Sequence, residues 1–328
     1  GHNKLFANAL LERIMEEIRI TSFIGKYKAQ TNYEFDLMGF VRLLIYGRIL
    51  NPASKIATVN QNNNYYSDVL KDVYEYNVYD TLSFLYDYKD KLINWVNNRL
   101  ISKFNRTTNV IYYDVTNFFF EIEEPDEEED DLRKMGVSKE HRKQPIVQMG
   151  LFMDEQGVPI SIETFPGNTL DHLTLKNALN KSINNLNLDR FILVGDRGMY
   201  RGDNSYYLTN MNNGYIISKS IEKTSKDEKE WIYNQEGYTV VSKDFKYKSR
   251  VIKRKVKVKD ELKDITEKVV VYFSKKFYDK QMYENKSFLE FIDKLEKNPE
   301  NFRITKSQSS SLRKFLKKEL INDKTGEI

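Results

Sequence analysis

Two aspartates stand where a carboxylate is expected to do chemistry. Asp114 lies inside the apolar, β-branched run Val110–Thr116, and Asp196 ends a second apolar run that begins at Arg190; both runs predict buried strands. A charge beside a sheet core is costly unless it is paired, hydrogen-bonded or bound to a metal ion. On neighbouring strands, the two carboxylates could share a site for two divalent ions about 4 Å apart, which act on phosphodiesters. The alternative is that Asp114 faces solvent and Asp196 caps a turn with Gly198.

Composition narrows this chemistry further. The 328 residues include no cysteine and 3 histidines, which excludes disulfides, thiol nucleophiles, zinc fingers and iron–sulfur clusters. Metal chemistry must then rest on carboxylates, so Mg²⁺ or Mn²⁺ is the expected cofactor. With 40% hydrophobic and 13% aromatic residues, a mainly disordered chain is excluded. No apolar run is long enough to span a membrane and no signal pattern opens the chain, so we expect a cytoplasmic protein.

The elements that must position the aspartates form an α/β core. The expected order is strand, strand, strand, helix, strand, helix, strand, at 110–116, 146–153, 158–165, 173–186, 190–196, 204–212 and 215–218. A turn at Asp154–Gly157 makes the second and third strands a hairpin, and helical crossovers bring in the last two. We therefore expect a helical N-terminal domain at 1–106, a core at 107–220, and a β-rich insertion with a helical tail at 221–328.

The N-terminal domain is expected to be all-α. Apolar residues recur at helical spacing around Leu10–Ile18 and again from Leu37 to a stop at Asn51-Pro52. Ser54 is expected to cap a short helix. A long helix is predicted from Thr81 to Phe104, capped by Asp80.

The insertion is expected to be basic. Lys243–Lys263 holds ten basic residues in twenty-one, and strict alternation predicts one strand face made of four lysines: Lys253, Lys255, Lys257 and Lys259. Such a face suits contact with a phosphate backbone, although a solvated face is the alternative. Trp231, Tyr233 and Tyr238 are expected to form a small core under this sheet or to stack on bases. Helices are predicted at 283–296 and 311–320.

Ordered motifs along about 35–275 resemble one family. They are Tyr112–Phe118, Gly136–Arg142, Gln148–Leu151, Gly157–Ile160, Phe165–Asp171 and Val194–Met199. This set resembles the insertion-sequence-four (IS-four) group of bacterial DDE transposases. The resemblance implies a ribonuclease H-like mixed-sheet core, with Asp114 and Asp196 as the first two catalytic aspartates and ligands of Mg²⁺ or Mn²⁺. It further implies cleavage and strand transfer of double-stranded DNA at element ends, by a homodimer acting at the nucleoid.

The third carboxylate of the family is not assigned by the sequence. The family carries it on a helix as Tyr-x2-Arg-x3-Glu-x6-Lys, and Tyr283, Lys286, Glu290 and Lys297 reproduce that spacing with Lys in place of Arg. The residue is expected beyond this chain, with Glu290 as one alternative and no third carboxylate as another. We accordingly expect divalent-ion binding or weak nicking from this chain alone, but not strand transfer.

Three further residues are candidate DNA contacts. Lys139 and Arg142 lie in a polar loop between predicted strands, where loop solvation is the alternative, and Arg197 follows Asp196. A non-catalytic DNA-binding fragment of a transposase is the second interpretation of the whole chain. A dehalogenase-type phosphatase is the third, but Val115 and Thr116 follow Asp114, so the second Asp of its Asp-x-Asp motif is missing.

Overall fold

A computed structural model describes residues 6–65, 69–128, 131–136, 144–186 and 188–298. It divides into two compact units, one of 1–223 with 255–265 and one of 224–254 with 266–328. Within the first unit, the helices and the sheet keep separate apolar cores. The three-domain division at 106 and 220 stays a prediction.

Helices fill the N-terminal part of the first unit. They are α1 (Asn8–Glu17), α2 (Ile20–Lys28), α3 (Leu37–Leu50), α4 (Lys55–Val59), α5 (Tyr76–Asp87) and α6 (Lys89–Phe104). Ser54 caps α4 as predicted, because its Oγ accepts a hydrogen bond from the Ala57 N–H at 3.2 Å. The helices bury Phe23, Phe40 and Phe84 in one core.

The single helix predicted over Thr81–Phe104 is wrong. The chain turns at Tyr88, whose φ of −103° and ψ of 13° lie outside helical values, and this separates α5 from α6. Asp80 lies inside α5 and therefore caps nothing. At this turn the ring of Tyr88 packs against Tyr27 of α2, with centroids 4.9 Å apart, which is a tertiary contact that the local apolar pattern does not show.

A five-stranded mixed sheet follows, in the order β3-β2-β1-β4-β5. Its strands are β1 (Val110–Phe119), β2 (Ile146–Met153), β3 (Pro159–Pro166), β4 (Ile192–Gly195) and β5 (Gly214–Ile217). β1, β2 and β3 pair antiparallel, while β4 and β5 are parallel to β1. The predicted α/β core with five strands is thus confirmed, including the turn before β3, where Gly157 has a φ of +78°.

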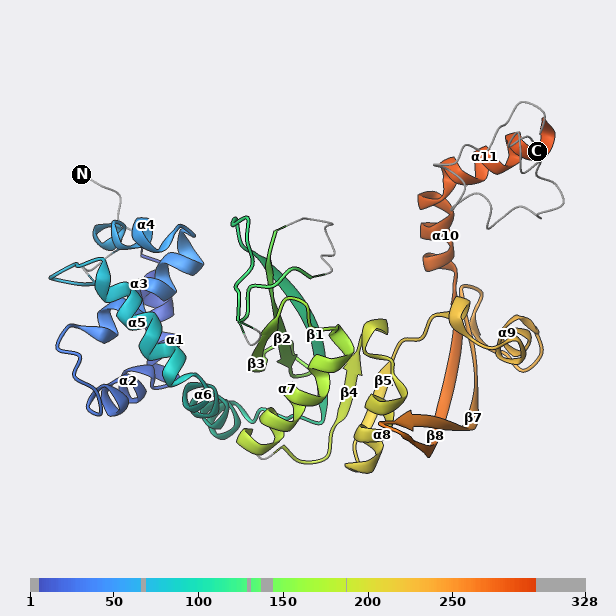
Figure 1. The fold of residues 1–328 in the computed structure, drawn as a ribbon, viewed down its shortest axis with the longest axis horizontal. Coiled ribbons are helices and arrows are strands. Elements are labelled where there is room, and N and C mark those ends of the chain that lie inside the picture. The colour runs from blue at the N-terminus through green and yellow to red at the C-terminus, as the bar shows by residue number, and fades with distance from the viewer. Residues whose placement is uncertain (1–5, 66–68, 129–130, 137–143, 187, 299–328) are drawn as a thin grey trace. The chain divides into compact units, whose positions relative to one another are not determined.

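Two helices cover one face of this sheet. α7 (Asp171–Leu186) and α8 (Gly202–Asn210) supply Leu175, Leu179 and Leu208 to a core that they share with alternate strand residues (Figure 1). The β1 contribution to that core is Ile111, Tyr113 and Val115. The residues between them, including Asp114, therefore point to the opposite face.

Polar contacts join the helices to the sheet within the first unit. The buried Arg106 guanidinium binds the Asp154 carboxylate at 2.8 Å and also donates to the Asn97 side chain. The Asn97 amide donates to the Ile160 carbonyl at 2.6 Å, and the Lys89 ammonium reaches Glu163 at 3.5 Å. We refer to these contacts as the polar seam.

A second sheet has three strands in the order β6-β7-β8. They are β6 (Thr239–Ser242), β7 (Phe245–Val258) and β8 (Glu261–Ser274), and the accompanying helices are α9 (Lys226–Tyr233), α10 (Lys275–Glu284) and α11 (Lys286–Lys297). The segment 221–328 was predicted to be β-rich, and these three strands lie within it. The predicted helix at 311–320 lies outside the described residues.

Candidate functional site

The sheet brings Asp114 and Asp196 to neighbouring strands. β1 and β4 pair in parallel with Tyr113 opposite Gly195, so Asp114 is the next residue of β1 and Asp196 is the first residue after β4. On the other side of β1, Asp114 lies opposite Leu151 of β2. Both aspartates are exposed. The pairing register of β1 and β4 therefore accounts for the predicted proximity of the two acids.

Each aspartate is held by a local hydrogen bond. Asp114 Oδ1 accepts from the Val115 N–H at 2.9 Å, and Asp196 Oδ1 accepts from the Gly198 N–H at 2.8 Å. The alternative drawn from the sequence thus describes the local structure correctly, because Asp114 is exposed and Asp196 caps a turn with Gly198. Each of these bonds involves one of the two carboxylate oxygens, so this turn geometry is compatible with a metal site.

Asp171 is a third acid at this edge of the sheet, and it is absent from the catalytic residues inferred from sequence. A Cβ placed on Gly198 would stand 3.1 Å from Asp196 Oδ1 and 3.5 Å from Asp171 Oδ2, so both carboxylates flank that glycine. In the sequence, Asp171 is the last residue of the Phe165–Asp171 motif. The simpler interpretation of an acid at that position is that it begins a helix. Because β3 is parallel to β1 and β4, the helix that follows β3 begins at the same edge.

Tyr113 links β1 to the start of α7. Its hydroxyl donates to Thr174 Oγ1 at 2.8 Å, and that hydroxyl donates to the Asp171 carbonyl at 2.6 Å. Burial raises the pKa of Tyr113, and the nearby carboxylates of Asp171 and Asp114 raise it further. The phenol therefore stays neutral, which keeps its hydrogen bond to Thr174 intact.

The donor set suits a hard cation but is incomplete. Carboxylate oxygens are the ligands that Mg²⁺ and Mn²⁺ prefer. Among the described residues, however, no group of three His, Cys, Asp or Glu side chains could hold a metal ion. Asp114 and Asp196 would thus need ligands from water or substrate phosphate.

Glu290 does not complete such a group in the described chain. It lies on α11, 60% exposed, with its carboxylate 4.0 Å from the Lys286 ammonium. The spacing pattern that singled it out is split, because Tyr283 lies in the last turn of α10 and the chain turns at Asn285 before α11 begins. A pattern that should occupy one helix therefore spans two.

The basic candidates have different settings. Lys253, Lys255 and Lys257 are exposed and alternate along β7. Lys259 is not on the strand, since β7 ends at Val258 and Lys259 has a φ of 54° in the turn that follows. Arg197 is exposed in the short 3₁₀ segment after Asp196, while Lys139 and Arg142 lie outside the described residues.

The sheet face that carries Asp114 has exposed apolar side chains. Tyr112 and Phe118, which flank Asp114 on β1, are 41% and 44% exposed. Ile192 on β4 and Ile216 on β5 are exposed as well, and the strand register places them on the same face. The aspartates therefore stand on an open surface, which is compatible with a large substrate.

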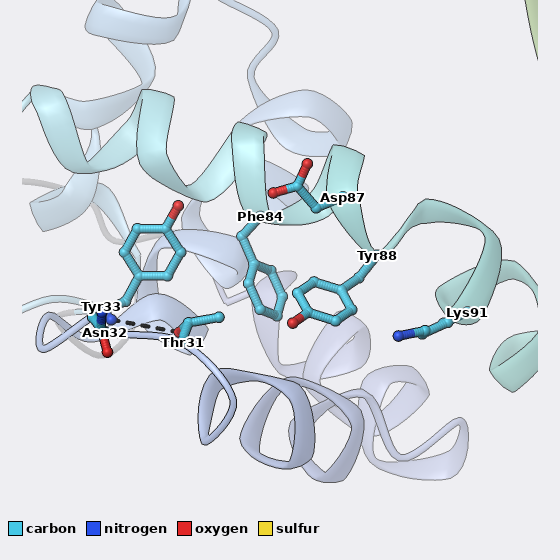
Figure 2. Close-up of a pocket in the computed structure, with 7 residues that line it drawn as sticks. All are labelled: Thr31, Asn32, Tyr33, Phe84, Asp87, Tyr88 and Lys91. Atoms are coloured by element: carbon cyan, nitrogen blue, oxygen red, sulfur yellow. Dashed lines mark hydrogen bonds between the residues drawn. The ribbon is translucent and has the colours of Figure 1, made fainter.

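A cavity of about 560 Å³ lies in the helical part (Figure 2). Tyr33, Phe84 and Tyr88 give it aromatic walls, and Asp87 and Lys91 lie at its rim. None of the predicted site residues that the structure describes lines it. This cavity is therefore separate from the chemistry expected at Asp114.

No family model and no curated protein matches the chain. Among solved structures, it is similar to the Mos1 transposase paired-end complex with left transposon end, at 12% identity and a TM-score of 0.24, over 61% of this chain and 70% of that chain. It is also similar to the piggyBac transposase synaptic complex with hairpin DNA, at 11% identity and a TM-score of 0.35, over 73% of this chain and 51% of that chain. The Mos1 mariner paired-end complex with Mn is a third, at 11% identity and a TM-score of 0.24, over 61% of this chain and 70% of that chain. The case for a function therefore rests on the sheet and its carboxylates.

A helix that crosses a bilayer must be both long and apolar. None of the helices in the described part of the chain combines these two properties.

Proposed function

We propose that the protein is a transposase that cleaves and joins DNA by the DDE two-metal mechanism. The observation that carries the proposal is the register of β1 and β4, which sets Asp114 and Asp196 side by side in a sheet of order β3-β2-β1-β4-β5. Sheet and acids together have the arrangement that the sequence resemblance implies. Membership of the insertion-sequence-four group, a homodimer and a bacterial cytoplasmic location belong to the same proposal.

The chain's own contribution is positioning. Hydrogen-bonded strands fix the Cα atoms of both aspartates, and the Gly198 N–H orients the Asp196 carboxylate. The open face around Tyr112 and Phe118 leaves room for a duplex to approach. Divalent ions held by Asp114 and Asp196 would stabilise charge on the attacking and leaving oxygens of the phosphodiester. Exposed Arg197 is placed to contact a phosphate nearby.

The second candidate is a DNA-binding fragment without catalysis. It is favoured by one observation, that no third acid completes a metal group among the described residues. The two functions differ in a simple assay. Nicking of supercoiled DNA bearing an element end, in the presence of Mn²⁺, is expected only from the first. Turnover of a small phosphomonoester would instead indicate the phosphatase that the sequence disfavours.

Metal binding tests the site directly. Asp114→Asn removes a charge without changing the volume of the side chain, so we expect it to lose Mn²⁺ binding, measured by the paramagnetic resonance of free Mn²⁺, while circular dichroism stays unchanged. Asp87→Asn, an exposed carboxylate of α5, is the matched control and should bind as the parent does. Equal Mn²⁺ affinity in Asp114→Asn and the parent would contradict the proposed site.

A further inference from the structure

The outer face of the second sheet is exposed along its length. In the second unit, β7 presents Phe245, Tyr247, Ser249, Val251 and Lys253 at alternate positions, and β8 presents Thr266, Lys268, Val270 and Tyr272. All nine side chains are exposed. The rings of Phe245 and Tyr272 stack with centroids 5.8 Å apart, which shows that the two rows share one face. The nine residues combine aromatic rings with lysines, and none of them is acidic.

The opposite face of the same strands is occupied by internal contacts. The buried Lys248 donates to the carbonyls of Asn234 and Glu236 and lies over the rings of Trp231 and Tyr238. The Arg250 guanidinium lies 4.4 Å from the centre of the Trp231 ring. Trp231 and Tyr238 therefore pack under the sheet, with cations as their partners. Tyr233, which was expected beside them, is 67% exposed instead.

An ion pair also joins β7 and β8 on that inner face. Arg254 Nη2 donates to Glu267 Oε1 at 3.0 Å, and both belong to rows that alternate with the outer residues. The outer aromatics are thus not required to hold α9 or the Arg254–Glu267 pair. Tyr247 is 38% and Tyr272 is 56% exposed, so both side chains are accessible from solvent.

We propose that this outer face binds unpaired single-stranded DNA. Aromatic rings on a sheet surface stack on bases, and nearby lysines neutralise the phosphates of the same strand. In duplex DNA the base faces are already stacked, so the rings would add nothing to its affinity. Lys253 and Lys268 give the face a charge opposite to that of a nucleic acid. The proposal deepens the proposed function and rests on it for its substrate, DNA.

The binding test uses the full chain in EDTA, so that it does not depend on the metal site. Fluorescence anisotropy with a labelled oligothymidylate should show tighter binding than with a duplex of equal length. Tyr247→Ala combined with Tyr272→Ala should weaken single-strand binding about tenfold or more, because each base–ring stack contributes about 1–3 kcal/mol, and should leave duplex binding unchanged. Tyr283→Ala, which removes an 80% exposed ring from α10, is the control.

Two further measurements keep the proposal decisive. Lys268→Gln retains every ring and should reduce the salt dependence of single-strand binding, so it tests the face even if the double variant unfolds. Equal affinity for single strand and duplex, or an unchanged single-strand affinity in the folded double variant, would overturn the proposal. Sedimentation gives another result that would overturn it. If the parent is a dimer and the double variant is a monomer with unchanged single-strand affinity, the face binds a second copy of the chain and not DNA. Failure of the parent protein to bind Mn²⁺, with single-strand binding intact, would contradict only the metal site.

Discussion

Tyr113 shows how a single residue joins the sheet to the helix behind it. It alternates with Asp114, so the strand that exposes the acid buries the phenol. The phenol binds Thr174 on α7 within the turn that begins at Asp171. The position of Asp171 relative to β1 therefore depends on a residue that has no chemical role in the proposed reaction.

Tyr113→Phe should lower the free energy of unfolding by about 1 kcal/mol at pH 7, since it removes one buried hydrogen bond. Burial raises the Tyr113 pKa above its ordinary value of 10.0, so the native state holds this proton more tightly than the unfolded chain. The contribution of this raised pKa to the free energy of unfolding is complete below the ordinary pKa of tyrosine. It is lost as the pH rises through the pKa of Tyr113 in the native state. Urea unfolding at pH 7 and pH 10.5 should therefore show a smaller decline with pH in the variant. Tyr86→Phe, at a 74% exposed ring, should match the parent at both pH values.

At the scale of elements, close packing of the backbone explains why two positions in the sequence motifs are occupied by glycine. A Cβ on Gly136 would stand 1.8 Å from the Gly167 carbonyl oxygen, and one on Gly167 would stand 2.1 Å from the Ile146 carbonyl oxygen. Three backbone segments therefore meet at the start of β2 too closely for any side chain. These glycines close the end of the sheet and need no role in chemistry.

Gly167→Ala should accordingly lower the free energy of unfolding by about 3 kcal/mol, at the upper end of what overpacking costs, because the neighbouring atoms are backbone and cannot move aside. Gly25→Ala is the control, since a Cβ at that position of α2 would meet no atom within 4 Å. It should increase stability by up to about 1 kcal/mol. Chemical denaturation of both variants measures the difference, and similar values for the two would show that the contact at Gly167 can relax.

The sequence predicted the strands better than it predicted where helices end. The apolar, β-branched run of β1 and the turn at Gly157 are local signals, and they were sufficient to place Asp114 and the β2–β3 hairpin. No Pro or Gly marks the turn at Tyr88, whose ring contacts Tyr27 of α2, a partner that is distant in the sequence. The Glu290 spacing is likewise a local pattern, and it does not reveal the break at Asn285 that separates α10 from α11. Which face of the sheet is open also depends on where α7 packs.

For the whole molecule, the proposed DNA contacts should be visible in the salt dependence of binding. Replacing Lys253, Lys255, Lys257 and Lys259 with Gln should weaken duplex binding and reduce the slope of log affinity against log salt by about 0.9 for each phosphate that the variant no longer neutralises. Lysines 275, 280, 286 and 297, each paired with an acid four residues away, allow a control with the same change in charge. Filter binding at several salt concentrations measures both slopes. An unchanged slope in the first variant would show that these lysines do not touch DNA.

The polar seam between α6 and the sheet has a kinetic consequence. Hydrogen bonds are directional, so Arg106 and Asn97 can bind Asp154 and Ile160 only after the helical core and the sheet core have each taken shape. Interactions that form after the rate-limiting step of folding slow unfolding and leave the folding rate nearly unchanged. The polar seam would then lower the rate of unfolding and would have little effect on the rate of folding.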